Sequence, residues 1–465
     1  MVTLPPHRCI TFAKHGFTRP MIPRIKSYFQ NIPKPLGRAL AKIPYEFRPG
    51  IGRCYAQQRQ TIETFEKFDT EQQKNFILLK FQKILHAAMR VPFYQDLYAA
   101  QGLTVDDVRN FSDIDKIPVV TKDMLRLIPL EDRSYKIRGR YITNTGGSSG
   151  SPLDFYITPQ LIPVEWAHMH MIWAELGYKQ DMLKLVFGGR NLSDKPFAYD
   201  GLRHGYSINV YKGFSDILPE LRKVIKNEAF AYLHGYPSAI AQFAEDCEQQ
   251  APDLVKMLRL TLRGAFLGSE YPAPVYRNRI ESIFAIPSVS WYGHTERAIL
   301  AWEKAEKYVY YPFQTYGYCE VIYNEESRGW RLIGTSYGNL ASPFIRYDTG
   351  DIVEPVEVND GLLVSFRIRS GRSGEFVLDR KGAKISLTAL VFGRHHRLFD
   401  IAKFIQVRQV KGGEMIVLVT LRHKLSPEFV FAEWFDGSGL DMDIKFEILE
   451  NPILSTGGKV TLKVH

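Results

Sequence analysis

Four short segments of this chain contain residue types that bind a nucleotide and activate an acid. The first lies between Thr143 and Pro152 and is rich in glycine and hydroxyl side chains. A glycine-rich backbone with hydroxyl groups offers many hydrogen-bond donors to phosphate oxygens. No lysine followed by serine or threonine comes after its last glycine, so this loop differs from the phosphate loop of common NTPases. Its composition alone fits a surface turn equally well.

The second and third segments supply an aromatic ring and carboxylates. In Trp291–Arg297, an aromatic side chain beside a glycine can stack on a purine, while Thr295 and Glu296 can bind phosphate and Mg²⁺. In Arg346–Asp351, the carboxylate after a glycine turn can accept hydrogen bonds from both ribose hydroxyls. Taken alone, Glu296 also fits a solvated carboxylate at the end of a strand.

The fourth segment, Ser455–Lys459, places a lysine on a glycine turn. A single lysine of this kind is usually an exposed side chain, so its meaning depends on the other three segments. The cysteines point to no competing metal chemistry, because they lie far apart, form no CxxC pair and have no histidine pattern beside them. A zinc site or a disulfide framework is therefore not expected, and a reducing cytoplasm is.

In this order, the four segments resemble the motifs of the adenylate-forming superfamily, which contains acyl-CoA synthetases, luciferases and the adenylation domains of peptide synthetases. Within it, the chain most resembles phenylacetate–CoA ligases and the related ligases of capsular-polysaccharide biosynthesis. The segments that carry this closer resemblance are Ala88–Tyr94, Ile117–Lys122, His234–Ser238, Tyr292–Arg297 and Tyr316–Glu320, of which the last two favour the capsule-type branch.

The resemblance implies a role for each matching residue. The triphosphate is expected at Thr145, Gly146, Gly147, Ser148, Ser149 and Gly150, and the adenine at Gly268, Ser269, Glu270, Tyr292 and Gly293. Thr295 is expected to contact the α-phosphate and Glu296 to bind Mg²⁺. Asp351 is expected to hold the ribose, with Arg372 beside it. Lys459 is expected to be the catalytic lysine, between the carboxylate and the α-phosphate.

The implied reaction joins a carboxylic acid to ATP, giving an acyl-adenylate and pyrophosphate. A carboxylate is already a nucleophile at neutral pH, so the protein mainly has to stabilise charge at the α-phosphoryl group. The acyl group is then expected to pass to coenzyme A, or to an amine or hydroxyl of a sugar or carrier. The expected acid pocket mixes aromatic and polar side chains, which suits an aryl, short acyl or amino acid, and consists of Trp166, Phe187, His234 and Tyr236.

Two other functional classes compete with this interpretation. One is a non-catalytic relative that acts as a structural or docking protein in an envelope-polysaccharide assembly. The presence of Lys459, Glu296, Asp351 and the glycine-rich loop argues against it. The other is a nucleic-acid-binding protein, suggested by the sequence pI of about 9.2. It is disfavoured because no nucleic-acid-binding motif is recognisable, so no nucleic-acid partner is expected.

The elements that must position these residues form an α/β protein with two parts. Residues 1–370 are expected to be a large region with mostly parallel sheets, because strands and helices alternate between Leu161 and Gln249. Strands dominate after Ala285, and a helical pattern runs from Thr61 to Ala100. A strand is also expected at Phe344–Tyr347.

Residues 371–465 are expected to be a small α+β lid that carries Lys459. It is predicted to contain a hairpin, Phe404–Val410 with Glu414–Leu421, and a helix at Ser426–Phe435. The preceding Arg369–Gly374 stretch is typical of a hinge. Gly374 stands where relatives have an acidic or lysine hinge residue, which leaves the position of the pivot open.

The beginning of the chain has a one-sided charge. The protein has a net charge of +10, and no acidic residue comes before Glu46. This segment either lies against anionic lipid or an acidic partner, or is a solvated basic face. No apolar run has the length of a membrane-spanning helix, so the protein is expected in the cytoplasm, with peripheral membrane contact as one option.

Overall fold

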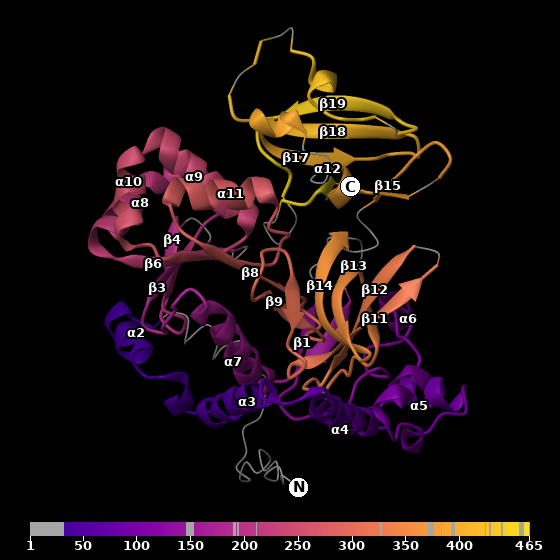
Figure 1. Cartoon of the computed structure of the whole chain (residues 1–465). Helices are drawn as coiled ribbons and strands as arrows, with labels where there is room; N and C mark the ends of the chain where they lie inside the picture. The colour runs from indigo at the N-terminus through magenta and orange to yellow at the C-terminus, as the bar shows by residue number, and fades with distance from the viewer. Residues whose placement is uncertain are drawn as a thin grey trace.

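The structure is a computed structural model that describes residues 32–145, 153–188, 192, 195–210, 212–325, 328–370, 376–382, 384–391, 396–423, 425–426, 429–438, 440–454 and 460–464. Several predicted site residues lie outside these ranges, namely Gly146, Gly147, Ser148, Ser149, Gly150, Arg372 and Lys459. The predicted α/β class is confirmed. A large lower region is covered at one end by a smaller C-terminal part (Figure 1).

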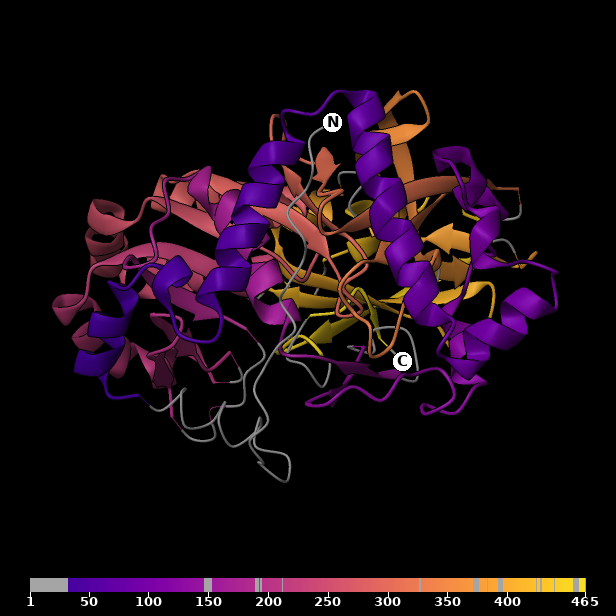
Figure 2. The ribbon, with the colours of Figure 1, turned by 90° about the horizontal axis from the view of Figure 1, so that it is seen from below.

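Helices form the outer layer at the start of the described chain. They are α2 (Lys34–Ala41), α3 (Gly52–Phe65), α4 (Thr70–Ala88), α5 (Pro92–Ala99) and α6 (Lys122–Arg126). The helical pattern expected from residue 61 to 100 is broken twice. Asp69 is the N-cap of α4: its side chain accepts a hydrogen bond from the Gln72 N–H, and the Gln72 side chain accepts one from the Asp69 N–H. Pro92 starts α5, because a proline fits the first turn of a helix. Figure 2 shows this layer crossing the underside of the molecule.

A twelve-stranded sheet forms the centre of the large region. In one half, the strands run parallel in the order β5 (Gly205–Ile208), β3 (Leu183–Phe187), β6 (Phe230–Gly235), β7 (Gly264–Leu267) and β8 (Ser288–Gly293), with β4 (Phe197–Asp200) antiparallel at the edge. Alternate side chains of these strands enter two cores, as the two-residue period of a strand requires. Leu233 packs with the helices on one face, and Tyr232 with α3 and α7 (Leu161–Ala174) on the other.

The helices on the first of these faces are α8 (Phe214–Asn227), α9 (Pro237–Gln250), α10 (Pro252–Thr261) and α11 (Pro274–Phe284). The other half of the sheet is antiparallel, so the parallel pairing stops at β8. Its strands are β9 (Leu300–Glu303), β10 (Tyr310–Pro312), β11 (Gly317–Asn324), β12 (Gly329–Ser336), β13 (Tyr347–Asn359) and β14 (Leu362–Ser370).

The strand expected at Phe344–Tyr347 is wrong, because β13 begins only at Tyr347. The residues before it form a tight connection in which the Ser336 N–H donates to the Phe344 carbonyl, at 2.9 Å. Arg346 has a φ of 44°, which interrupts an extended backbone. The apolar side chains of this segment pack into the core from a loop, and their pattern alone resembles a strand.

The C-terminal part has a core of its own. Its elements are β15 (Phe376–Leu378), β16 (Lys384–Ser386), α12 (Leu387–Val391), β17 (Ala402–Arg408), β18 (Glu414–Leu421), β19 (Asp443–Leu449) and β20 (Lys463–Val464), and its main sheet has the order β19, β18, β17, β20. The predicted hairpin is confirmed as β17 and β18. The helix predicted at Ser426–Phe435 is wrong: among its described residues, only Phe431–Glu433 form a short 3₁₀ turn. Aromatic side chains of this irregular segment pack into the C-terminal core, and this packing is made without a helix.

Candidate active site

Three of the predicted segments meet at the carboxyl ends of adjacent parallel strands. Gly235, which follows His234, ends β6 and pairs with Leu267 of β7, and Leu267 pairs in turn with Ser290 of β8. The segments that follow these strands therefore lie side by side at one edge of the sheet, with Ser269 after β7 and Glu296 after β8. Ligands of open α/β sheets bind at this edge.

Two glycines allow the strands to come close there. A Cβ on Gly235, which has a φ of +142°, would lie 1.9 Å from the Phe187 carbonyl oxygen, and a Cβ on Gly268 would lie 2.2 Å from the Trp291 ring. Ser269 follows with a φ of 68°, a left-handed conformation that non-glycine residues rarely adopt. Such conformations concentrate at functional sites, where the surrounding structure holds them.

Glu270 connects this edge to helix α9. Its Oε2 accepts hydrogen bonds from the Ser238 hydroxyl at 2.7 Å and from the Ser238 N–H at 3.3 Å. Ser238 is in the first turn of α9, where a carboxylate interacts favourably with the helix dipole. Glu270 thus fixes the loop after β7, and its expected contact with adenine stays a prediction.

The residues expected at adenine and ribose contact each other. The Tyr292 hydroxyl donates to Asp351 Oδ2 at 2.5 Å, although the two residues lie on different strands, β8 and β13. The backbone N–H of Asp351 donates to the Thr349 hydroxyl at 3.2 Å. Asp351 is only 7% exposed. The aromatic ring and the carboxylate therefore form one surface on which a nucleoside can lie.

Glu296 is a buried carboxylate, 3% exposed, held by two neighbours. The Tyr347 hydroxyl donates to its Oε1 at 3.0 Å, and His294 Nδ1 lies 3.1 Å from its Oε2. Thr295, which lies between His294 and Glu296 in the sequence, is exposed. His294 and Tyr347 were not predicted to have these roles, although both lie inside the predicted segments.

The surroundings of Glu296 fit Mg²⁺ better than a metal held by protein alone. No cluster of three or more potential metal-ligating side chains occurs in the described part of the chain. Mg²⁺ commonly uses one or two carboxylates and completes its shell with water and substrate phosphates. A single buried carboxylate such as Glu296 fits that pattern.

The glycine-rich loop begins and ends at a short hairpin. β1 (Tyr141–Asn144) pairs antiparallel with β2 (Asp154–Ile157), so residues 146–152 connect the two strands. Thr145 is buried and closes the hairpin: its N–H donates to the Leu153 carbonyl at 3.0 Å, and its hydroxyl accepts from the Leu153 N–H at 2.9 Å. Its expected contact with phosphate stays a prediction.

Of three residues in the expected acid pocket, two lie in one aromatic group and the third lies on the other face of the sheet. His234 contacts Trp291 with stacked rings 5.6 Å apart, and Trp173 of α7 with ring centroids 5.1 Å apart. Trp166 joins the same group through Trp173, at 5.6 Å. Phe187 does not join it, because alternation along β3 directs its side chain to the other face, against Phe243 of α9. The expected grouping of Phe187 with His234 is therefore wrong.

The remaining residue of that set, Tyr236, precedes α9, and its N–H donates to the Phe187 carbonyl at 2.9 Å. Beneath the aromatic group lies Lys184 of β3, which is 3% exposed. It donates to the Tyr178 hydroxyl at 2.6 Å and to the Arg203 carbonyl at 3.1 Å. Burial lowers the pKa of Lys184 to about 7 and the pKa of His234 to about 3. Lys184 was not predicted, because a lysine within an apolar strand has no distinctive sequence signal.

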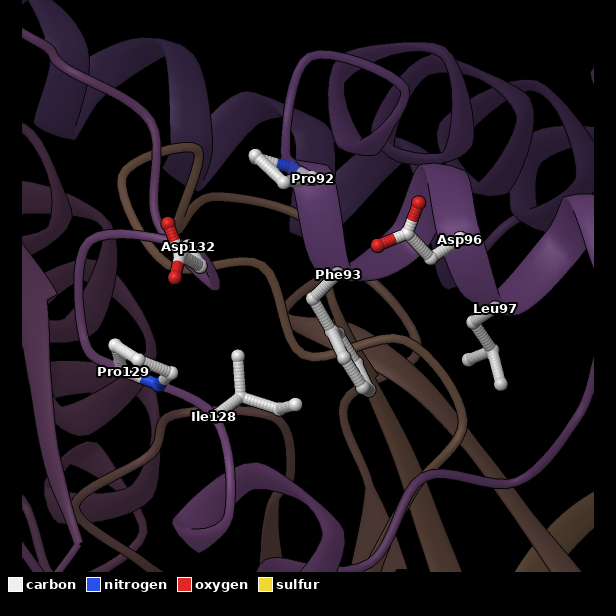
Figure 3. Close-up of a pocket in the computed structure, with 7 residues that line it drawn as sticks. All are labelled: Pro92, Phe93, Asp96, Leu97, Ile128, Pro129 and Asp132. Carbon is white, nitrogen blue, oxygen red and sulfur yellow. The ribbon is translucent and has the colours of Figure 1, made fainter.

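A separate cavity of about 430 Å³ lies between α5 and the loop that contains Ile128 (Figure 3). Its walls are mostly apolar, and the carboxylates of Asp96 and Asp132 stand at its sides. None of the predicted site residues lines it. It is therefore not the expected acid pocket.

The C-terminal part rests on α9 and α11 of the large region (Figure 1). Phe404 of β17 is 5% exposed and packs into the core of the large region, with its ring 6.1 Å from that of Tyr276. Lys403 forms an ion pair with Asp246 at 3.5 Å, and Arg422 forms one with Glu245. The C-terminal part is thus held against the large region by an apolar contact and by ion pairs.

Comparison with solved structures identifies the fold. The chain is similar to 2-hydroxyisobutyryl-CoA ligase in the postadenylation state with R3-HIB-AMP, with a TM-score of 0.62, 18% identity and coverage of 85% of this chain and 90% of that chain. The same ligase in the thioesterification state, with 2-HIB-AMP and CoA, gives 0.51 at 16% identity over 85% and 90%. The chain has the fold of the adenylate-forming CoA ligases, as its motifs predict.

Comparison of sequences adds another similar protein. Protein CapK of Staphylococcus aureus is 22% identical over 349 residues, which are 71% of this chain and 75% of that protein. No family model matches the chain. Within the described ranges, no helix combines the length and the apolar character needed to cross a membrane.

Proposed function

From the fold that this chain shares with adenylate-forming CoA ligases, we propose that it is an AMP-forming ligase that activates a carboxylic acid with ATP and Mg²⁺. The observation that carries the proposal is the convergence of separate predicted segments at one sheet edge. The Tyr292–Asp351 hydrogen bond joins β8 to β13, and the Tyr347–Glu296 hydrogen bond joins the segment after β8 to β13.

Each group in this site has a task in adenylation. The Tyr292 ring and the Asp351 carboxylate hold the nucleoside, and the Tyr292 hydroxyl orients the carboxylate. Glu296 offers one carboxylate to the metal and is kept in place by Tyr347 and His294. When bound, Mg²⁺ neutralises phosphate charge as the acid approaches.

The bond changes follow from the two reactants. A carboxylate oxygen of the acid forms a bond to the α-phosphorus of ATP, and the bond from that phosphorus to pyrophosphate breaks. Lys459 supplies positive charge between the two anions in this step, an interaction that is strongest in the transition state. No general base is needed, because the attacking carboxylate is already ionised.

The acceptor in the second step is coenzyme A, or an amine or hydroxyl of a sugar or carrier. The similarity to CapK is the observation that favours an acceptor from polysaccharide biosynthesis. We further propose that residues 1–370 form the nucleotide- and acid-binding region and residues 371–465 the lid. The higher similarity to the postadenylation state than to the thioesterification state supports a lid seated for the first step.

ATP–pyrophosphate exchange tests the proposal. Purified protein should catalyse exchange with ATP and Mg²⁺ in the presence of at least one acid from a panel of aryl, short acyl and amino acids, and EDTA should abolish it. Exchange that persists in EDTA would remove the role proposed for Glu296. If the protein binds ATP but shows no exchange with any acid of the panel, this would favour the non-catalytic relative instead.

A further inference from the structure

The lid strand β17 has two faces with different partners. Ile405 and Val407 point into the core of the lid, whereas Phe404 packs into the core of the large region. Because strand side chains alternate, Gln406 shares the face of Phe404. Gln406 is 1% exposed, so a polar side chain in this position needs hydrogen-bond partners.

Those partners are the two ends of the segment that carries Lys459. The Gln406 side-chain amide donates to the Ile453 carbonyl at 2.8 Å and to the Thr461 carbonyl at 2.8 Å, and its oxygen accepts from the Ile453 N–H at 2.8 Å. Next to these contacts, Leu454 and Val460 form an antiparallel bridge. One side chain therefore holds the chain together on both sides of residues 455–459.

The same end of the lid also contacts the large region. Val460, the neighbour of Lys459, packs against the core that contains Phe404 and Tyr276. Strand β17 thus contacts the large region through Phe404 and, through Gln406, the residues on both sides of the segment that carries Lys459, which form the base of that segment. A shift of this base by one ångström would displace Lys459 relative to the α-phosphate, and shifts of that size cost about 10²-fold in rate.

We propose that Gln406 is a positioning residue for adenylation, which acts by fixing the base of the segment that carries Lys459. This inference rests on the proposed function. It assigns Gln406 to the first half-reaction alone, because only that step uses the lysine in the proposed mechanism.

The test replaces Gln406 by methionine, which keeps the length of the side chain and removes all three hydrogen bonds. The matched control is Gln409→Met: Gln409 bonds the Leu378 backbone in both directions and the Glu414 carbonyl, all in the lid and remote in sequence from Lys459. Gln406→Met should lower the kcat of ATP–pyrophosphate exchange by roughly 10- to 100-fold. Transfer from synthetic acyl-adenylate to the acceptor should change by less than about 2-fold in both variants, and Gln409→Met should retain exchange.

A double variant separates positioning from stability. In the Lys459→Arg background, which keeps a positive charge and is chosen to retain measurable exchange, Gln406→Met should cause a much smaller further loss than in the parent, because residues that act through one another are not additive. An additive loss, equal losses in both half-reactions, or equal effects of Gln406→Met and Gln409→Met would overturn the inference. If Gln406→Met shows no cooperative thermal unfolding transition, Gln406→Glu replaces it in the test. Glutamate keeps an acceptor for the Ile453 N–H, and the same criteria apply. Absence of exchange in the parent protein would refute the proposed function instead.

Discussion

Replacing Gly268 by alanine tests whether the close approach of β7 to Trp291 shapes the acid pocket. The new Cβ would lie 2.2, 2.6 and 2.7 Å from Cζ2, Cε2 and Cη2 of Trp291. Non-bonded carbon atoms prefer separations of about 3.5–4.0 Å, so the ring must move by about 1 Å or more. The indole ring cannot bend, and it is stacked on His234, so the displacement passes into the aromatic group.

Overpacking of this kind typically costs about 1–3 kcal/mol of stability. We expect Gly268→Ala to raise the KM for the acid in pyrophosphate exchange by roughly 10-fold or more, the loss given by about 1.4 kcal/mol of binding energy. Although Gly268 is also expected near the adenine, the KM for ATP should change less, because Tyr292 alternates with Trp291 along β8 and packs against a different core. Thermal unfolding measures the stability cost in parallel.

Gly264→Ala is the matched control, since Gly264 begins the strand that Gly268 follows, and a Cβ at either position would meet a side chain of the same core. Its Cβ would meet mainly Cδ1 of Leu176 at 2.7 Å, the end of a flexible side chain. This control should lose stability without losing affinity for the acid. In Gly268→Ala, a second change of Trp291→Phe should restore part of the affinity by removing the atoms that clash. Equal activity of the two glycine variants, or a rise in the KM for ATP alone, would refute the reasoning.

Four other predictions follow from the site and the charge distribution. Lys459→Ala should abolish exchange yet spare transfer from synthetic acyl-adenylate; exchange that survives would mean that the catalytic lysine is another residue. Glu296→Gln should weaken metal binding, so that added Mg²⁺ partly restores exchange, and a defect insensitive to Mg²⁺ would count against that role. Removing residues 1–31, which leaves α2 and its Lys34 and Arg38 ion pairs with Glu228 intact, should preserve exchange and reduce salt-sensitive binding to anionic vesicles; salt-insensitive binding, or none in the intact protein, would contradict this. Burial lowers the pKa of His168 to about 4, so the unfolded state binds its proton first and stability should fall as pH drops from about 6.5 to about 4, by up to about 3 kcal/mol; in urea titrations, the stability difference between the parent and His168→Gln should change with pH in that window and stay constant above it.

The amino-acid sequence by itself determined the chemistry that is expected here. The glycine-rich loop, Glu296, Asp351 and Lys459 were recognisable because four short motifs occur in the order found in the adenylate-forming superfamily, although each motif alone is ambiguous. The strands β3, β6 and β8 were also predictable, since buried parallel strands are short apolar runs between helical segments. These features depend on local order along the chain.

Tertiary structure decided which side chains meet. Phe187 and His234 lie on paired strands, but the alternation of side chains places them on opposite faces, and only the register of β3 against β6 reveals it. The helix expected at Ser426–Phe435 gave way to an irregular segment, because packing of its aromatic residues against the lid core outweighs helix propensity.

The contacts that hold the site join residues far apart in the sequence. Tyr292 bonds Asp351, Tyr347 bonds Glu296, and Gln406 bonds both ends of the segment that carries Lys459. No local sequence pattern predicts these hydrogen bonds, because a tyrosine or glutamine within a strand looks the same in the sequence whether or not its side chain has a buried hydrogen-bond partner. The sequence therefore determined which groups are expected to do the chemistry, and the packing of β8, β13 and β17 decided how the described partners are held, because hydrogen-bond geometry depends on distances that only the folded chain creates.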